Sequence, residues 1–466
     1  MTERKRKPQR RKSRNRTGVN IRALALDALL DISRGGERSD RIIGGTLDKY
    51  DYLEAREKAF FKRLTEGTLE RRIELDYCIG TVSSVPVGKM KPLIRELLRM
   101  SAYQILFMDG IPDRAACDEA VKLAARHSFR SLKGFVNGVL RSLCGRKGHI
   151  AYPDPETERT AYLSVRYSMP AWLIEKWDSE QGQGDTERIL QGLLEEKPVT
   201  IRLRERLSDA ERAAVRRELE RSGALIRESA ALPFVWHLKG LEGLKNNRAF
   251  AAGLFTVQDI SSVLAVEAAG IREGDFVLDV CAAPGGKALF AAEKAGACGR
   301  VLARDVSGRK LALLEESRRR LQADALTAEQ WDARQPDENL YGRADVVLAD
   351  VPCSGLGVIG KKQDIKYRVG PEEIESLLPL QRQILETVQR YVKPGGILLY
   401  STCTVSRAEN EEMMRWFLER FPFRAGSLRP FLPAVFSGET TENGYFQFLP
   451  GIHDTDGFFI ARLVRE

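Results

Sequence analysis

The chain of 466 residues is 43% hydrophobic and 30% charged, which is the composition of a globular protein rather than of a fibrous or disordered one. It is longer than one hydrophobic core usually supports, so we expect about two to four domains. No apolar run approaches the roughly 20 residues that cross a bilayer, and no apolar segment follows the basic N-terminus, which disfavours a membrane or secreted protein. Seven scattered cysteines and four histidines far apart indicate free thiols in the cytoplasm and no metal site.

The first 16 residues form a basic segment, with nine Lys or Arg against one Glu, and they carry nearly all of the net charge of +9. We expect a disordered arm over residues 1–18. A flexible basic arm binds polyanions by releasing their counterions, which favours RNA or DNA as a partner. A solvated tail without a specific role has the same composition, so the arm supports nucleic-acid binding without establishing it.

Residues 19–148 are predicted to form an all-α domain. Apolar residues lie on one stripe of a helix over Ile21–Ser33, prolines are sparse, and no alternating strand pattern appears. Gly145–Pro155 contains two glycines and two prolines and is predicted to be a linker. Further helices are expected at Leu53–Ile79, Met90–Met108, Ala115–Arg126 and Leu132–Leu143.

Residues 149–250 are predicted to form a small α+β segment. Ser208 and Glu211 stand at the spacing of a capping box, which opens a helix that we expect to end near Ser222–Gly223. Two other helices are expected at Ala171–Trp177 and Thr186–Glu195, with strands at Val199–Leu203, Leu225–Arg227 and Phe234–Leu238.

Residues 251–466 are predicted to form an α/β domain, because short apolar strands alternate with helical or loop segments from Gly253 onward. Such alternation implies a mostly parallel sheet with helices on both faces. Ligands of these sheets bind at the carboxyl ends of the strands. The predicted strands are Phe276–Val280, Val301–Asp305, Leu326–Gln330, Val346–Ala349 and Ile397–Ser401.

A nucleoside site is predicted at the carboxyl ends of the first three of these strands. The first strand leads into a loop where Gly285 and Gly286 allow the backbone to approach a ligand closely, and the helix that follows supplies unpaired N–H groups. Asp305 ends the second strand, where such folds place an acid that binds ribose hydroxyls, and Asp332 follows the third, where it could receive an adenine amino group. The chain lacks a GxxxxGK[ST] phosphate loop, so S-adenosylmethionine fits better than NAD or ATP; a tight turn with two capping aspartates is the alternative. The loop consists of Cys281, Ala282, Ala283, Pro284, Gly285, Gly286 and Lys287.

Two cysteines, Cys353 and Cys403, follow the last two predicted strands, one in Asp-Val-Pro-Cys and the other in Ser-Thr-Cys. Methylation of cytosine at carbon 5 needs a thiolate that first adds to carbon 6 and a base that later removes the carbon-5 proton. Two thiols can divide these roles, and Asp350 could protonate ring nitrogen 3. A single buried cysteine is usually just a small apolar residue, but two at strand ends beside a nucleoside site favour catalysis. Spacing alone does not rank the two thiols.

The motifs CAAPGGK (281–287), DVPCSG (350–355), KPGG followed by YSTC (393–403) and DGFF (456–459) resemble those of the Sun family, in the RsmB/NOP/NSUN superfamily of RNA cytosine-C5 methyltransferases. The stretches SAYQILF, EAV and GFVNGVLR within 101–141 resemble a NusB-type RNA-binding domain, and this fusion is similar to the bacterial RsmB branch, which methylates one cytosine of 16S rRNA. The resemblance covers almost the entire chain. It implies an all-α NusB-like domain, a small α+β (RRM-like) segment and a Rossmann-like class I methyltransferase domain that uses S-adenosylmethionine.

The resemblance also implies roles for single residues. It makes Cys403 the nucleophile and Cys353 the cysteine of product release. It further implies that Lys287 helps to orient the catalytic region. One departure concerns RNA contact: the Arg-Val-Asn that the family has in the first strand of the middle segment reads Arg202-Leu203-Arg204 here. The implied cofactor contacts are Cys281 through Lys287, Asp305, Asp332 and Asp350.

The implied partner is 16S rRNA before or during small-subunit assembly, bound by a monomer. A single-stranded loop is the expected target, because the cytosine must leave its stack to reach a thiol. A tRNA or large-subunit rRNA substrate remains open, since the surfaces of the appended domains choose the RNA. A non-catalytic RNA-binding, antitermination-like scaffold is the alternative of another class, and the intact aspartates and cysteines argue against it.

Overall fold

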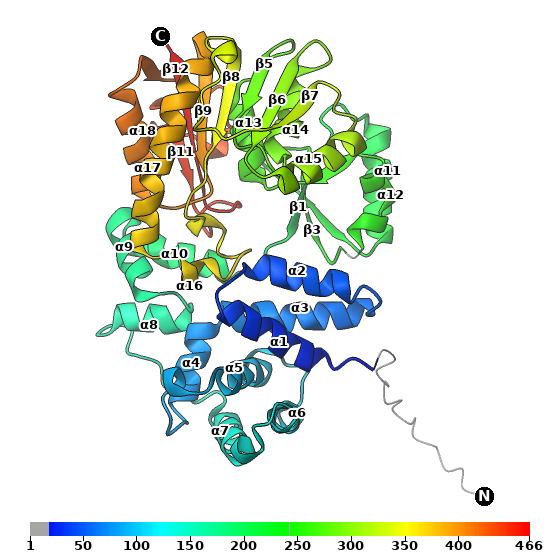
Figure 1. Ribbon diagram of the computed structural model, residues 1–466, viewed down its shortest axis with the longest axis vertical. Coiled ribbons are helices and arrows are strands. Elements are labelled where there is room, and N and C mark those ends of the chain that lie inside the picture. The colour runs from blue at the N-terminus through cyan, green and yellow to red at the C-terminus, as the bar shows by residue number, and fades with distance from the viewer. Residues whose placement is uncertain (1–17, 242) are drawn as a thin grey trace, which may run out of the picture. The chain divides into compact units, whose positions relative to one another are not determined.

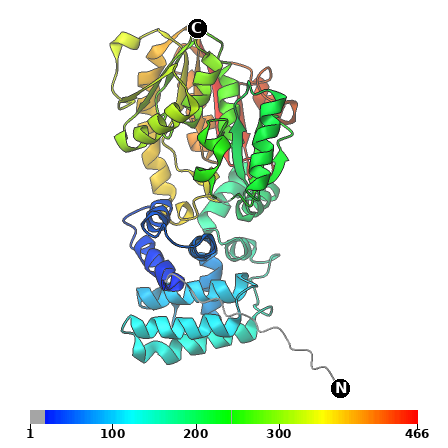
Figure 2. The same ribbon diagram turned by 90° about the vertical axis from the view of Figure 1, so that its right-hand side faces the viewer.

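The computed structural model describes residues 18–241 and 243–466, so the predicted basic arm lies almost entirely outside the described residues. The chain divides into two compact units, Met1–Ser168 and Met169–Glu466. Each unit can be followed along the chain in Figure 1 and, after a quarter turn, in Figure 2. Within the described ranges, no helix is both long and apolar enough to cross a bilayer.

The first unit is all-α, as predicted. Two differences from the prediction concern its first half. The helix expected over Leu53–Ile79 is two helices, because Arg71 leaves the helical conformation (φ −98°, ψ 14°) without interrupting the apolar periodicity. Helix α2 was not predicted, since Gly44 and Gly45 lower its intrinsic helix propensity, whereas burial of Ile43 in the core favours it. The helices are α1 (Ile21–Ser33), α2 (Ser39–Lys49), α3 (Ala55–Glu70), α4 (Arg72–Gly80), α5 (Pro92–Phe107), α6 (Asp113–Arg126), α7 (Lys133–Arg146) and α8 (Arg159–Arg166).

The segment after α7 is bound to the first unit rather than being a free linker. Tyr152 donates its hydroxyl to Glu74 at 2.6 Å, and Tyr77 donates to the carbonyl oxygen of Ala151 at 2.7 Å. The hydroxyl of Ser168 accepts the N–H of Ile73 at 2.9 Å. These contacts with α4 explain why the first unit extends to Ser168, about 20 residues beyond the predicted boundary.

The second unit begins with α9 (Ala171–Gln181) and α10 (Gln183–Leu194) and continues into a small four-stranded antiparallel sheet. The strand order β2-β3-β1-β4, with α11 between β1 and β2, is that of an RRM-like fold. The predicted capping box is present: Ser208 accepts the N–H of Glu211, and Glu211 accepts the N–H of Ser208 at 2.8 Å. The sheet takes its last strand from beyond residue 250, where the sequence placed the domain boundary. Its elements are β1 (Val199–Leu203), α11 (Asp209–Arg221), β2 (Leu225–Glu228), β3 (Val235–Lys239), α12 (Arg248–Ala251) and β4 (Phe255–Val257).

The large sheet has eight strands in the order β10-β12-β9-β8-β5-β6-β7, with β11 beside β12. The five predicted strands are present and mutually parallel. The three C-terminal strands pair antiparallel and were not predicted; β10 and β11, with three and four residues, are too short to show alternation. The strands are β5 (Phe276–Asp279), β6 (Arg300–Asp305), β7 (Leu326–Gln330), β8 (Ala344–Asp350), β9 (Val392–Thr402), β10 (Phe423–Ala425), β11 (Tyr445–Phe448) and β12 (Phe458–Arg465).

Helices cover both faces of this sheet. Val346 and Leu348 belong to the core shared with α13 (Ile260–Ala269), α14 (Gly286–Ala295) and α15 (Gly308–Leu321), whereas Val347 and Ala349 belong to the core shared with α17 (Pro371–Val388) and α18 (Glu411–Leu418). Successive residues of one strand therefore face opposite helix layers. The cofactor loop and the two cysteine motifs lie at the carboxyl ends of β5, β8 and β9, as expected for a doubly wound sheet.

Candidate active site

The two cysteines lie side by side, with 3.3 Å between their Sγ atoms. Cys353 follows β8 and Cys403 follows β9, and these strands are parallel neighbours in the sheet. Their carboxyl ends meet at one edge, which brings together residues 50 positions apart. Both side chains are partly buried and neither forms a disulfide.

The surroundings distinguish the two thiols. The hydrogen bond from Cys353 and the ammonium groups of Lys362 and Lys287 lower the pKa of Cys403, although burial opposes this change. The same thiol contact, together with burial, raises the pKa of Cys353 well above its usual value. Because the thiolate is the nucleophilic form of cysteine, this arrangement favours Cys403 as the nucleophile and Cys353 as the protonated partner.

Lys287 and Asp350 form an ion pair next to the thiols, with 2.7 Å between Nζ and Oδ2. Asp350 ends β8, and its other oxygen accepts the hydroxyl of Ser401 at 3.0 Å. Burial acts to lower the pKa of Lys287, but the negative charge of Asp350 outweighs it and the pKa is raised. The pair joins the cofactor loop, which supplies Lys287, to β8, which leads to Cys353, and the hydrogen bond from Ser401 extends this link to β9, which leads to Cys403.

A cavity of about 300 Å³ opens beside this pair. Gly285 precedes α14 in a left-handed conformation (φ +111°), and a Cβ there would lie 2.8 Å from Leu314. Glycine is therefore required for this turn. Of the predicted cofactor residues, the cavity is lined by Cys281, Ala282, Ala283, Pro284, Gly286, Lys287 and Asp350.

The two predicted nucleoside carboxylates lie at the ends of neighbouring strands. Asp305 ends β6, and its Oδ2 accepts the N–H of Ala283 at 3.2 Å, so it supports the cofactor loop directly. Asp332 lies two residues beyond β7, where the guanidinium of Arg334 holds its carboxylate at 2.6 Å and lowers its pKa. Contacts of Asp305 and Asp332 with ribose and adenine stay predictions.

Two buried polar atoms that belong to lining residues have no hydrogen-bond partner among the described residues, namely Oδ2 of Asp279 and Nε2 of Gln258. Burial raises the pKa of Asp279 to about 7; Lys287 opposes this rise and Asp350 adds to it. An acceptor and a donor left unpaired in one cavity fit a polar ligand that carries both kinds of group, as S-adenosylmethionine does. The sequence did not point to either residue, although Asp279 ends β5 as Asp305 ends β6.

Glu409 links the loops that carry the two cysteines. It is fully buried, and it accepts the hydroxyl and the N–H of Ser354 at 2.5 and 2.9 Å. Gln381 of α17 donates to the same carboxylate at 3.1 Å. Ser354 follows Cys353, and Glu409 lies six residues beyond Cys403, so this carboxylate connects the two cysteine loops. Its neighbours Arg407 and Glu412 are exposed, so the sequence carries no sign that Glu409 is buried.

The closing DGFF motif (456–459) contacts the loop that follows β8, close to the two cysteines. Lys361 donates to Asp259 at 2.7 Å and to Asp456 at 2.5 Å. Gly457 donates its N–H to the carbonyl oxygen of Gly357 at 2.9 Å, and a Cβ on Gly357 would lie 1.9 Å from the oxygen of Gly457. A Cβ on Gly457, the glycine of the motif, would lie 2.5 Å from the Cα of Gly357, so both positions need glycine where the two backbones cross.

Comparisons with known proteins agree with this geometry. The model of the family described as 16S rRNA methyltransferase RsmB/F matches residues 267–464, and that of the NusB family matches residues 19–144. A probable ribosomal RNA small subunit methyltransferase B of Bacillus subtilis is 34% identical over 96% of this chain and 99% of its own length. The crystal structure of PH0851 superposes with a TM-score of 0.79 at 26% identity, covering 96% of this chain and 99% of that one. NSun6 from Pyrococcus horikoshii, solved with SFG, shares the fold over 64% of this chain and 98% of its own, with a TM-score of 0.56 at 22% identity.

The doubly wound sheet, the glycine-bearing loop after β5 and the cavity beside it define a methyltransferase that uses S-adenosylmethionine. The chain belongs to the RsmB/F family of 16S rRNA methyltransferases and carries a NusB-type domain at its N-terminal end. The predicted family, fold class and cofactor are thereby confirmed.

Proposed function

We propose that this protein methylates carbon 5 of a cytosine in 16S rRNA through a covalent bond between Cys403 and the base. The observation that carries the proposal is the 3.3 Å contact between Cys403 and Cys353 beside the Lys287–Asp350 pair. A methyltransferase acting on a nitrogen or oxygen has no need of two adjacent thiols. An unreactive ring carbon does need a nucleophile that activates it and a base that later removes its proton, so that the enzyme thiol can leave.

S-adenosylmethionine, held by the loop 281–287 and by Asp305, Asp332 and Asp350, supplies the methyl group as an electrophile. The Cys403 thiolate adds to carbon 6 of the cytosine, which makes carbon 5 nucleophilic. Ring nitrogen 3 receives a proton from the Lys287–Asp350 pair. The sequence suggested that Asp350 alone donates this proton. The ion pair changes that role, because Lys287 carries the proton and Asp350 holds the Lys287 side chain in place.

After carbon 5 has been methylated, Cys353 removes the proton that remains on it. Cys353 must first lose its own proton, and the Lys287–Asp350 pair, emptied in the first step, offers an acceptor in the same site. The electrons of the broken C–H bond form the carbon 5–carbon 6 double bond and expel Cys403 as a thiolate. Nitrogen 3 then returns its proton to solvent, and both thiols and the ion pair are restored.

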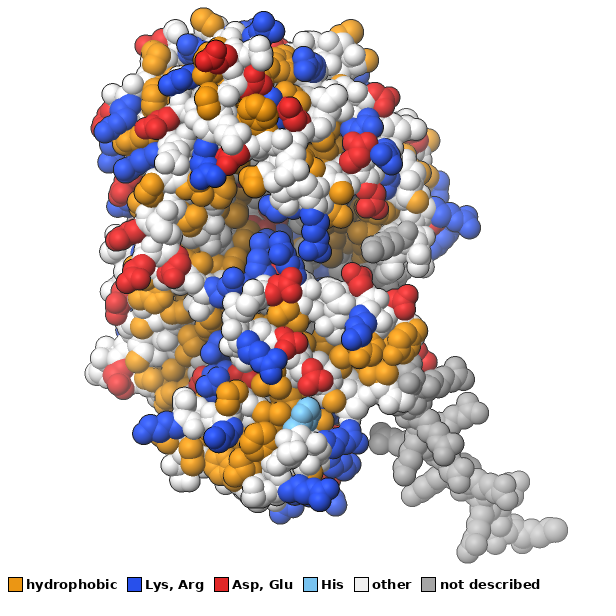
Figure 3. All heavy atoms as spheres, in the orientation of Figure 1, with side chains coloured by type: hydrophobic (Ala, Val, Ile, Leu, Met, Phe, Trp, Pro, Cys, Tyr) orange, Lys and Arg blue, Asp and Glu red, His pale blue; other side chains and the backbone are white. Residues whose placement is uncertain are grey.

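The choice of 16S rRNA rests on the family and on the name of the Bacillus subtilis relative. The NusB-type unit would capture RNA through its phosphates. Exposed basic residues along α7 and the short turn before it would serve this contact: Arg130, Lys133, Arg141, Arg146 and Lys147. Lys and Arg side chains also lie over both units on the face shown in Figure 3.

The test uses unmodified 16S rRNA transcribed in vitro, incubated with the protein and S-adenosylmethionine and then sequenced after bisulfite treatment. One protected cytosine with the wild-type protein, and none with Cys403→Ala, is the expected result. Parallel reactions contain tRNA, 23S rRNA and small-subunit particles. Protection confined to tRNA or 23S rRNA would overturn the substrate, and no protection in any RNA, with cofactor binding intact, would overturn the reaction.

A further inference from the structure

Gln258 is a buried amide in the wall of the cofactor cavity. It lies between β4 and α13, with 6% of its surface exposed. Its backbone N–H donates to the carbonyl oxygen of Thr200 at 3.0 Å, which extends the pairing of β4 with β1 by one residue. Its side chain lines the cavity together with Gly286 and Lys287.

Arg202 determines which way the amide points. The Nε of Arg202 donates to Oε1 of Gln258 at 2.9 Å. Arginine has only donors, so the atom facing it must be the oxygen of the amide, and the orientation of the group follows from chemistry. The Nε2 of Gln258 is thereby turned away from Arg202, and it is buried without a hydrogen-bond partner among the described residues.

The free Nε2 lies at the start of α14. A Cβ built on Gly286, the first residue of this ten-residue helix, would be 3.5 Å from Nε2. The first backbone N–H groups of a helix lack intrahelical partners and carry the positive end of the helix dipole. An amide donor beside them completes a site for an anion.

S-adenosylmethionine has one anionic group, the carboxylate of its methionyl part; its sulfonium and ammonium groups are cationic and its adenosine is neutral. We propose that Gln258 donates from Nε2 to this carboxylate and that Arg202 acts as a positioning residue that holds the amide in this orientation. The proposal rests on the established cofactor and does not depend on which RNA or which base is methylated.

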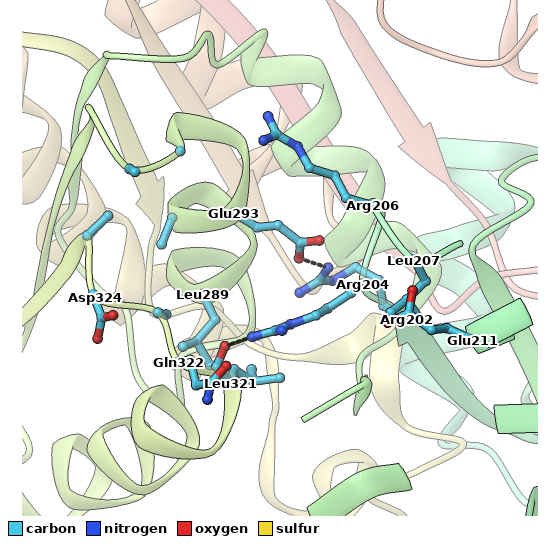
Figure 4. A pocket seen from close by; sticks show the side chains of 15 residues that line it. Arg202, Arg204, Arg206, Leu207, Glu211, Leu289, Glu293, Leu321, Gln322 and Asp324 are labelled. Carbon is cyan, nitrogen blue, oxygen red and sulfur yellow. Dashed lines mark hydrogen bonds and ion pairs between the residues drawn. The ribbon is translucent and has the colours of Figure 1, made fainter. Parts of the chain in front are cut away.

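Arg202 is itself held firmly. Its guanidinium forms an ion pair with Glu293 at 2.5 Å and lies 4.1 Å from the centre of the Phe290 ring, and 2% of the side chain is exposed. Figure 4 shows this pair at the wall of a second cavity, where Arg204 reaches the carbonyl oxygen of Leu321. Arg202 thus has its partners inside the protein, and its side chain is buried rather than presented to solvent. The strand β1 of the small sheet instead supports the cofactor site of the large one.

The decisive variant is Gln258→Glu, which keeps an oxygen for Arg202 but places a second oxygen where Nε2 donates. Two ligands are titrated by calorimetry, namely S-adenosylhomocysteine and its decarboxylated analogue, which lacks only the carboxylate. The affinity of the weaker ligand is measured by displacement of the stronger one. We expect the wild type to prefer S-adenosylhomocysteine by about 10- to 100-fold, as for hydrogen bonds to a charged group. In Gln258→Glu this preference should fall to within about threefold, because only the carboxylate-bearing ligand is weakened.

Gln258→Met is the second variant, since it removes the donor without adding charge, and it should reduce the preference in the same direction. Gln383→Glu, an exposed substitution on α17, is the matched control and should leave both affinities unchanged. Equal weakening of both ligands would leave the preference unchanged and would mean that Gln258 only supports the fold. Unchanged affinities for both ligands would mean that Gln258 does not meet the carboxylate, and either result overturns the proposal. No RNA is present, so failure of the 16S rRNA reaction and failure of this inference are separate outcomes.

Discussion

The carboxylate of Glu409 accepts both the hydroxyl and the backbone N–H of Ser354, at 2.5 and 2.9 Å, across the gap between the two cysteine loops. Neither residue contacts a reacting atom in the proposed mechanism. Together they nevertheless fix the backbone on which Cys353 stands relative to the strand that carries Cys403. The alignment of the two thiols therefore depends on Glu409 as well as on the strands.

Replacing Glu409 by Gln should slow methyl transfer by about 10- to 100-fold, because an amide nitrogen would replace one of the two oxygens and face one of the donors of Ser354. The same clash should lower the free energy of unfolding by about 1–3 kcal/mol. Single-turnover rates and denaturant titrations measure the two effects. Glu412→Gln, an exposed neighbour on α18, is the control. A variant with wild-type rates would show that the thiols are aligned without Glu409.

The two thiols should give different products when each is removed. In Cys353→Ala the proton on carbon 5 has no base, so Cys403 should remain bonded to the RNA. A protein–RNA band resistant to heating in denaturant is expected for this variant. Cys403→Ala should give neither the band nor methylated RNA. Adducts in Cys403→Ala but not in Cys353→Ala would reverse the assignment of the two roles.

The central part of the active site follows from the sequence, because parallel strands fix where their carboxyl ends lie. The sequence placed Cys353 and Cys403 at the ends of two strands beside the cofactor site, and the pairing of β8 with β9 in the structure makes them neighbours. Asp279 lies near the end of the expected strand Phe276–Val280, so it could have been proposed as a site residue in the same way as Asp305. The loop 281–287 that follows has the stronger motif, and the cofactor site was assigned to that loop instead. No periodicity revealed β4, because three residues are too few to show alternation.

The remaining contacts depend on loops and on long-range pairing. Glu409 is buried only because the chain turns back after β9, and its exposed charged neighbours predict a solvated helix start. Arg202 and Gln258 are 56 positions apart and fall in different predicted domains, and only the antiparallel pairing of β1 with β4 places them together. Such contacts are decided by tertiary packing, which leaves no local pattern in the sequence.

The lowered pKa of Cys403 predicts a chemical difference between the thiols. At neutral pH a larger fraction of Cys403 than of an ordinary cysteine is thiolate, so iodoacetamide should label it faster than Cys353, whose pKa is raised. Lys287→Met removes a positive charge and leaves Asp350 unpaired, and both changes raise the pKa of Cys403. Its labelling profile, followed by mass spectrometry of the peptide, should move to higher pH. The exposed Cys298 is an internal reference, and its profile should not move.

Asp279 makes the protein without cofactor less stable as the pH rises. Its pKa is about 7 in the folded protein, against about 3.9 for an unfolded aspartate. Between these two values the folded state binds more protons than the unfolded state, so the free energy of unfolding falls with rising pH and levels off above 7. Asp279→Asn removes this dependence and keeps an oxygen for the N–H of Cys281.

The variant should therefore gain stability over the wild type between about pH 4 and pH 7, reaching about 2–4 kcal/mol. Melting temperatures at pH 5 and pH 8 measure this gain, and the difference between variant and wild type should be larger at pH 8. Asp324→Asn, at a side chain that is 95% exposed, should change the melting temperature equally at both values. Parallel curves for Asp279→Asn and the wild type would mean that Asp279 is ionised throughout, with its buried oxygen stabilised by water or a bound ion.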